Sequence, residues 1–120
     1  MRPTEAVTKF NRPTPELPVE DVERAQRYYR DVLGFEIGWI EPDKGIGAVS
    51  RDSAAVFFRK RSRPFEAVVH WVFAEEIDAM YEKLRAAGAK IVDPLERKPW
   101  GLRQFTIEDL DGHLFHFHCD

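Results

Sequence analysis

The sequence predicts an α+β protein built from two tandem βαβββ modules, each a strand, a helix and three further strands. Two observations predict it. The order of elements before residue 60 recurs after residue 66, on either side of a charged connector, Lys60 to Pro64. Helix-starting acids and helix-ending glycines also recur at equivalent places, Asp21 with Glu76 and Gly34 with Gly88. We expect one domain over residues 1–120, with modules at about 14–60 and 66–119 that complete one another's core.

The first module opens with a short segment bracketed by Pro13, Pro15 and Pro18. Proline lacks the amide hydrogen that a sheet ladder needs, so a strand here is expected at an edge. Asp21 is a helix N-cap residue, an apolar stripe follows at helical spacing, and Gly34 ends the helix. Three strands separated by turns complete the module, at residues 35–41, 46–50 and 54–59.

The second module repeats this order, with a strand at residues 67–73. Glu75 and Glu76 are expected to open its helix, because acids stabilise the positive end of a helix. Gly88 ends that helix, and a strand begins at residues 89–93. A hairpin over Trp100 to Cys119 supplies the last two strands around the turn Asp109 to Gly112.

The last strand carries an informative alternation. His116 and His118 share one face, while Phe115 and Phe117 share the other, because successive strand side chains point to opposite sides. The two imidazoles could begin a metal site, or they could be strand histidines that only form hydrogen bonds. A metal site needs a third ligand, for which the candidates are His70, His113 and Glu16.

The remaining histidines and several aromatic residues are expected to have mainly structural roles. His70 lies in an apolar strand and is expected in the core or at an interface. His113, beside the turn, is expected to be solvated. Trp71 and Phe73 alternate with His70 and are expected to pack in the core. Trp100, between Pro99 and Gly101, either covers the rim of the sheet or lines a site.

The composition excludes several classes of protein. The net charge of −3 gives no electrostatic basis for binding nucleic acid, and no apolar run is long enough to span a bilayer. Cys119 is the only cysteine, which excludes an internal disulfide and suits a reducing compartment. We expect a soluble, cytoplasmic protein.

Three segments carry a resemblance to a known family. They are residues 15–22 running into 33–35, residues 47–57, and residues 99–117. Together with the two βαβββ modules, they resemble the vicinal oxygen chelate superfamily, which holds glyoxalase I, extradiol dioxygenases and the fosfomycin and bleomycin resistance proteins. The bleomycin resistance proteins look closest. The resemblance implies a curved mixed sheet around a cleft.

The resemblance also bears on cofactors. The superfamily's metal enzymes place their ligands at positions that correspond here to Thr14, Phe57, Val69 and His116. Only His116 could bind a metal, so the resemblance implies a metal-free site. The alternative is a metal-dependent enzyme of the glyoxalase or dioxygenase type, with zinc, iron or manganese in a displaced site formed by His70, His116 and His118.

Bleomycin resistance proteins bind their drug without altering it, in aromatic clefts at the interface of a homodimer. By this resemblance Trp39, Phe57 and Trp100 would stack on an aromatic small molecule, such as a bleomycin-type antibiotic. Arg59 and His116 would orient its polar groups, and Arg59 suits a flat aromatic or anionic ligand. Residues 1–12 are expected to form a loose arm, and the N-terminal arm to cross to the partner.

Overall fold

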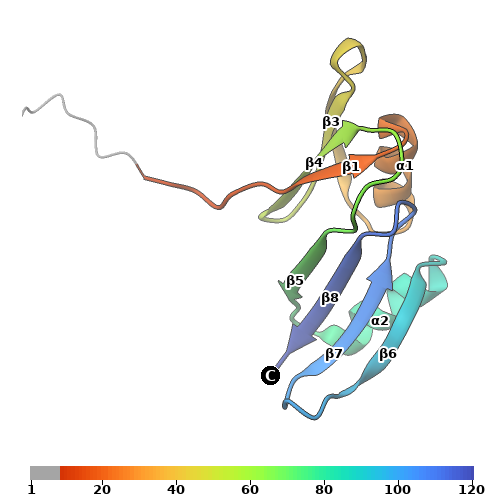
Figure 1. The fold of residues 1–120 in the computed structure, drawn as a ribbon. Coiled ribbons are helices and arrows are strands. Elements are labelled where there is room, and N and C mark those ends of the chain that lie inside the picture. The colour runs from red at the N-terminus through yellow and green to blue at the C-terminus, as the bar shows by residue number, and fades with distance from the viewer. Residues whose placement is uncertain (1–8) are drawn as a thin grey trace, which may run out of the picture.

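The computed structural model describes residues 9–120 as two βαβββ modules in tandem, and Figure 1 shows their two sheets arranged end to end. The predicted α+β fold is confirmed. The first eight residues of the expected arm lie outside the described part. The elements are β1 (Glu16–Val19), α1 (Val22–Asp31), β2 (Glu36–Glu41), the 3-10 helix η1 (Pro42–Lys44), β3 (Ile46–Arg51), β4 (Ala54–Lys60), β5 (Val69–Phe73), α2 (Ile77–Ala86), β6 (Lys90–Arg97), β7 (Arg103–Glu108) and β8 (Leu114–Cys119).

Both modules have the same sheet topology, with strand orders β1-β4-β3-β2 and β5-β8-β7-β6. The first strand of each module pairs in parallel with the last, and the other pairs are antiparallel. Strand β1 lies at a sheet edge, as its prolines predict. Strand β6 is also an edge and continues through Pro94, which an edge tolerates because its outer side needs no ladder hydrogen bond.

The two helices begin in different ways. Asp21 caps α1 as predicted, and its side chain accepts a hydrogen bond from the Arg24 amide at 3.0 Å. Glu76 occupies the equivalent position before α2, but its φ is +50° and its side chain caps nothing. Glu75 and Glu76 thus stand at the start of this helix as predicted, with Glu76 in the N-cap position and α2 beginning at Ile77, but Glu76 gives α2 no side-chain cap like that of Asp21.

Helix α1 approaches β3 closely at Gly47. A Cβ atom built there would lie 2.8 Å from Val22 Cγ1 and 2.9 Å from Gln26 Nε2. Gly47 therefore lets the helix sit directly on the sheet, and Gln26 uses the contact to donate hydrogen bonds to the carbonyls of Trp39 and Ala48. Neither α1 nor α2 has the length and apolar character that crossing a bilayer requires.

The modules are joined by a buried polar junction. The Tyr29 hydroxyl of α1 donates to Asp109 Oδ2 at 2.5 Å, in the turn between β7 and β8. Next to this turn, His113 Nδ1 accepts from the Val68 amide at 2.9 Å, so Nε2 carries the proton and donates to the Pro18 carbonyl at 2.6 Å. His113 is fully buried, and the expectation that it is solvated is wrong because its turn packs on the other module.

Candidate functional site

Each sheet has one face against its helix and one face free of helices. In the first sheet Leu17, Val56 and Phe58 are buried on the helix side. Strand alternation puts Phe57 and Arg59 on the opposite, helix-free face. In the second sheet Phe115 and Phe117 are buried, and the alternating residues His116 and His118 lie on the helix-free face. The candidate site is built on these two helix-free faces.

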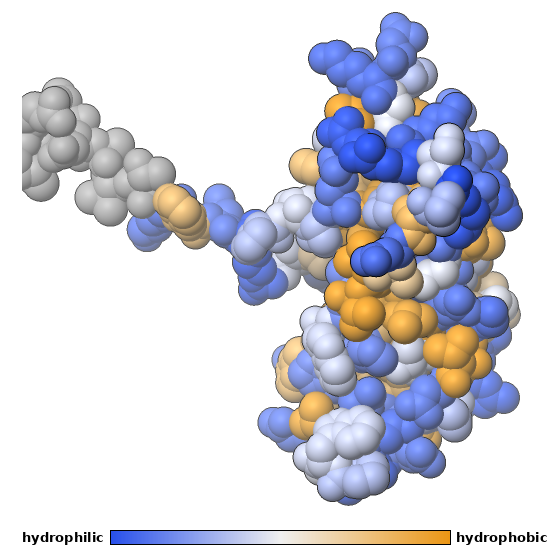
Figure 2. All heavy atoms as spheres, in the orientation of Figure 1, coloured by the Kyte–Doolittle hydropathy of each residue, from blue (hydrophilic) through white to orange (hydrophobic). Residues whose placement is uncertain are grey.

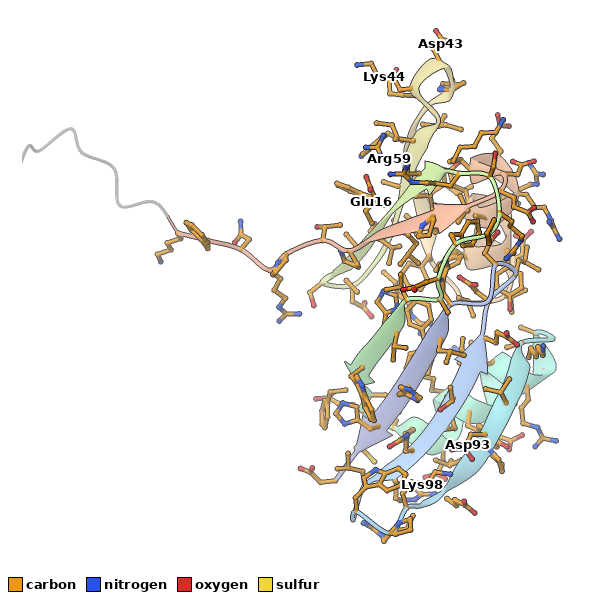
Figure 3. The ribbon with its side chains drawn as sticks, in the orientation of Figure 1. Glu16, Asp43, Lys44, Arg59, Asp93 and Lys98 are labelled. Carbon is orange, nitrogen blue, oxygen red and sulfur yellow. The ribbon has the colours of Figure 1, made fainter. Side chains whose placement is uncertain are left out.

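The helix-free face of the first sheet carries an aromatic pair. The rings of Trp39 and Phe57 meet edge to face, with centroids 5.2 Å apart. Beside them Arg59 Nε donates to Glu16 Oε1 at 2.8 Å, and Figure 3 shows the two side chains turned toward each other. Both ring side chains are exposed, so this face offers stacking surface to a ligand.

The helix-free face of the second sheet is the larger aromatic surface. Trp71 is 56% exposed and Phe73 58%, and Trp100 in the β6–β7 loop is 61% exposed. The expectation that Trp71 and Phe73 pack in the core is wrong. Parallel pairing sets Trp71 beside His116 and Phe73 beside His118, which fixes the face on which all four lie.

The two histidines of β8 lie among these rings. The His116 ring contacts the Trp71 ring at a tilt of 34°, with centroids 4.4 Å apart, and its Nδ1 lies 2.7 Å from Thr106 Oγ1. Burial lowers the pKa of His116, against a smaller opposing effect of the Asp93 charge, so the ring is neutral at pH 7. His118 contacts the edge of Trp71, and its Nδ1 is buried without a hydrogen-bond partner among the described residues.

His70 lies on the other side of this sheet. Its register partner is Phe115, on which it stacks with centroids 4.5 Å apart, and its Nδ1 lies 3.3 Å from the Leu114 carbonyl oxygen. Burial lowers the pKa of His70 as well. The sheet separates His70 from His116 and His118, so these three do not form a metal site. Within residues 9–120 no three or more His, Cys, Asp or Glu side chains are grouped to hold a metal ion.

The register shows where the positions lie that the resemblance assigned to metal ligands. The β1 neighbour of Phe57 is Glu16, and Thr14 precedes the strand. The β5 neighbour of His116 is Trp71, and Val69 pairs with Leu114 instead. The paired neighbours on the helix-free faces are thus Glu16 with Phe57 and Trp71 with His116, which combine two rings with one carboxylate and one imidazole.

Trp100 is held by a closely bonded loop. Its indole N–H donates to Gln104 Oε1 at 3.0 Å. Lys98 is buried beneath the loop, and its Nζ lies 2.9 Å from Asp93 Oδ2 and 3.0 Å from Glu96 Oε1 (Figure 3). Burial alone would lower the pKa of Lys98, but its hydrogen bonds to the two carboxylates outweigh burial and raise that pKa. The loop thus presents a largely exposed Trp100 ring that is tied to the sheet through Gln104.

The aromatic faces are open in a single chain. Two surface hollows of about 200 and 320 Å³ lie elsewhere, one at the start of α1 and the other between the end of α1 and α2. None of the predicted site residues lines either of them. Figure 2 shows hydrophobic side chains gathered at mid-height of the visible surface, where the two sheets meet.

This arrangement can be compared with known proteins. Residues 9–117 match the family described as the glyoxalase/bleomycin resistance protein/dioxygenase superfamily. The chain belongs to this superfamily. The resemblance found in the sequence is thus confirmed, and the match spans both modules and every candidate site residue except His118.

Individual relatives agree with this assignment. Uncharacterized protein YraH of Bacillus subtilis (strain 168) is 28% identical over 114 residues, covering 82% of this chain and 89% of YraH. The crystal structure of TioX from Micromonospora sp. ML1 has a TM-score of 0.77 at 29% identity, covering 90% of this chain and 98% of TioX. A bleomycin-binding protein complexed with bleomycin has a TM-score of 0.79 at 20% identity, covering 92% of this chain and 99% of that protein, and shares the fold.

The structure brings Trp39, Phe57 and Arg59 together on one sheet, and Trp100 and His116 on the helix-free face of the other. It adds Trp71 and Phe73, which the sequence analysis placed in the core, and it pairs Glu16, considered there only as a metal ligand, with Arg59. A signal for the first two was present, because Val69, Trp71 and Phe73 alternate with His70 and Val72. Both sets are largely apolar, so alternation alone did not indicate which set faces the helix.

Proposed function

We propose that this protein binds a planar aromatic small molecule without altering it, in a cleft formed where the aromatic faces of two copies of the chain come together. The observation that carries the proposal is the exposure of Trp71, Phe73 and Trp100, each more than half accessible on the helix-free side of the second sheet or in its adjoining loop. Exposed aromatic groups of this size mark binding or association surfaces. The site contains no metal in this proposal.

A second copy of the chain would supply the other wall of the cleft. Stacking needs rings on both sides of a ligand, and in one chain each aromatic face has an open side. The arm offers a means of joining the copies. The arm is held to the first sheet by hydrogen bonds from the Phe57 amide to the Pro15 carbonyl and from Arg12 to Ser53. Toward residue 9 it runs away from the sheets in Figure 1, and Phe10 is 96% exposed, which supports an arm that crosses to the partner.

A bleomycin-type antibiotic is one candidate ligand, and sequestering such a drug would be the resulting role. The shared fold of the bleomycin-binding protein suggests this candidate, and the aromatic faces supply the stacking that flat rings require. The metal-dependent enzyme with a site at His70, His116 and His118 is not proposed, because the sheet lies between His70 and the other two.

Ligand titrations followed by tryptophan fluorescence test the proposal, with bleomycin and a panel of planar aromatic metabolites in the presence of a chelator. Trp71→Ala and Trp100→Ala should each weaken binding roughly tenfold, because a base-sized aromatic stack contributes about 1–3 kcal/mol. Leu110→Ala, an exposed apolar residue on the β7–β8 turn, serves as the matched control and should bind normally. Unchanged affinity in both tryptophan variants would refute the site, and a monomer by light scattering would refute the two-copy cleft.

A further inference from the structure

The helix-free face of the first sheet carries a cation whose charge is already neutralised. Arg59 lies two residues beyond Phe57 on β4, and its guanidinium forms an ion pair with Glu16 at 2.8 Å. Glu16 and Phe57 are register neighbours on the parallel strands β1 and β4. The carboxylate, the guanidinium and the Phe57 ring therefore share one face. The pair is partly exposed, with 40% of the Arg59 side chain and 46% of the Glu16 side chain accessible.

Lys98, beside the second sheet, is also paired with carboxylates. The Lys98 ammonium, below the loop that presents Trp100, is bonded to Asp93 and Glu96 and also to the Pro94 carbonyl at 3.2 Å. Only 3% of the Lys98 side chain is accessible, so a ligand stacked on Trp100 cannot reach the ammonium.

This pairing has a consequence for any ligand on the aromatic faces. An anionic group that approached Arg59 would meet the Glu16 carboxylate beside it, and the two charges would largely cancel at the distance of a ligand. To pair with Arg59, the anion would have to displace Glu16 and also give up its own hydration. An uncharged ring system can bind without displacing Glu16 and without losing the hydration of a charge. Of the two kinds of ligand expected to suit Arg59, flat aromatic or anionic, the pairing with Glu16 favours the flat aromatic one.

We propose that Glu16 is a specificity-determining residue, and that by neutralising Arg59 it makes the site select uncharged planar aromatic molecules over anionic ones. The inference rests on the proposed function, since it concerns the same aromatic faces. It adds the class of ligand and assigns a role to a residue outside the stacking set.

Two probes that differ by a single charge test the inference, anthraquinone-2-carboxamide and anthraquinone-2-carboxylate. Calorimetric titration of the full chain at pH 7.5 and low salt should show the amide binding roughly 3- to 10-fold tighter, the range expected for one partly solvated charge interaction. In Glu16→Gln the carboxylate should gain roughly 3- to 10-fold while the amide changes less than about 2-fold. The gain should shrink at 0.5 M salt, because salt screens exposed charges. The screening length is about 10 Å at 0.1 M and 3 Å at 1 M, and at 0.5 M it lies between these two values.

Glu20→Gln is the matched control. Glu20 forms a comparably exposed ion pair with Arg63 at 3.0 Å, so the variant removes the same charge away from Phe57, while Arg63 keeps its second partner, Asp111, at 3.5 Å. It should leave both affinities unchanged. Arg59→Gln is a second variant, which leaves the Glu16 carboxylate unpaired and should weaken the carboxylate probe further. Thermal unfolding of all three variants checks that they are folded.

The outcomes separate this inference from the proposed function. If the amide binds but the carboxylate binds equally well, or if Glu16→Gln brings no gain for the carboxylate, the role of Glu16 is overturned and the aromatic site stands. A cationic analogue, 2-(aminomethyl)anthraquinone, that bound more than tenfold tighter than the amide would overturn the assignment of an uncharged ligand. If none of the three probes binds, the aromatic site and this inference both fall.

Discussion

Removal of the Tyr29 hydroxyl tests whether the buried polar junction holds the two modules together. The hydroxyl donates to Asp109 Oδ2 at 2.5 Å, across 80 residues of sequence, and Tyr29 is 1% exposed. The other carboxylate oxygen of Asp109 accepts from the amides of Asp111 and His113, so Tyr29 is the side-chain donor to Oδ2. Tyr29→Phe keeps the ring and its packing and leaves that oxygen buried without its donor.

The expected cost is that of a hydrogen bond to a charged group, about 1.5–3 kcal/mol. Unfolding entropy scales with chain length, so for a chain of 120 residues this cost should lower the midpoint of thermal unfolding by roughly 6–12 °C. Urea unfolding followed by circular dichroism measures the free energy directly. One protein concentration must be used throughout, because self-association changes the apparent stability.

The matched control is Tyr81→Phe. Tyr81 is half-buried and packs on Phe105, and no hydrogen bond to its hydroxyl is present among residues 9–120, so its loss should cost less than about 0.5 kcal/mol. A Tyr29→Phe variant as stable as this control would refute the role of the junction.

The junction also predicts a response to alkaline pH. Burial, followed by the Asp109 charge, raises the pKa of Tyr29 well above its ordinary value. The unfolded chain therefore loses this proton at about pH 10 while the folded chain retains it, and the wild type should lose stability as the pH rises above about 10. Tyr29→Phe should lack this part of the decline.

Three further predictions follow from single residues. Gly47→Ala should destabilise the chain by about 1–3 kcal/mol in urea, because the new methyl would overlap Val22; a neutral variant would contradict the close approach of α1. Lys98→Met should increase acrylamide quenching of Trp100 in a chain whose other tryptophans are replaced by Phe, and unchanged quenching would show that Lys98 does not hold the loop. Burial lowers the pKa of His70 below 6.5 in the folded chain, so the unfolded chain takes up the proton first as the pH falls, and the stability present above pH 6.5 is lost as the pH falls through the folded pKa. His70→Phe should therefore lose less stability than the wild type between pH 7 and 5 in urea titrations, and an equal loss would count against this prediction.

Local signals in the sequence determined the order of elements and much of their boundaries. The Asp21 cap, the prolines of β1 and the hairpin turn at Asp109 to Gly112 all act on their own neighbours, and all three were predicted correctly. The repeat of these signals was enough to predict two modules of one topology, and with it the superfamily. The resemblance also grouped Trp39, Phe57 and Arg59 in one ligand site, and the structure places these three on the helix-free face of the first sheet.

The tertiary structure alone decided which residues share a face and what each one meets there. Strand alternation separates His70 from Trp71 but does not say which of them faces the helix. That is set by the pairing of β5 with β8, some 45 residues further along the chain, where Trp71 meets His116. His113 is buried for the same reason, because a turn that looks solvated by sequence packs against the other module. The neutralisation of Arg59 by Glu16 is likewise a contact between distant strands, and contacts of this kind depend on register, which no local pattern encodes.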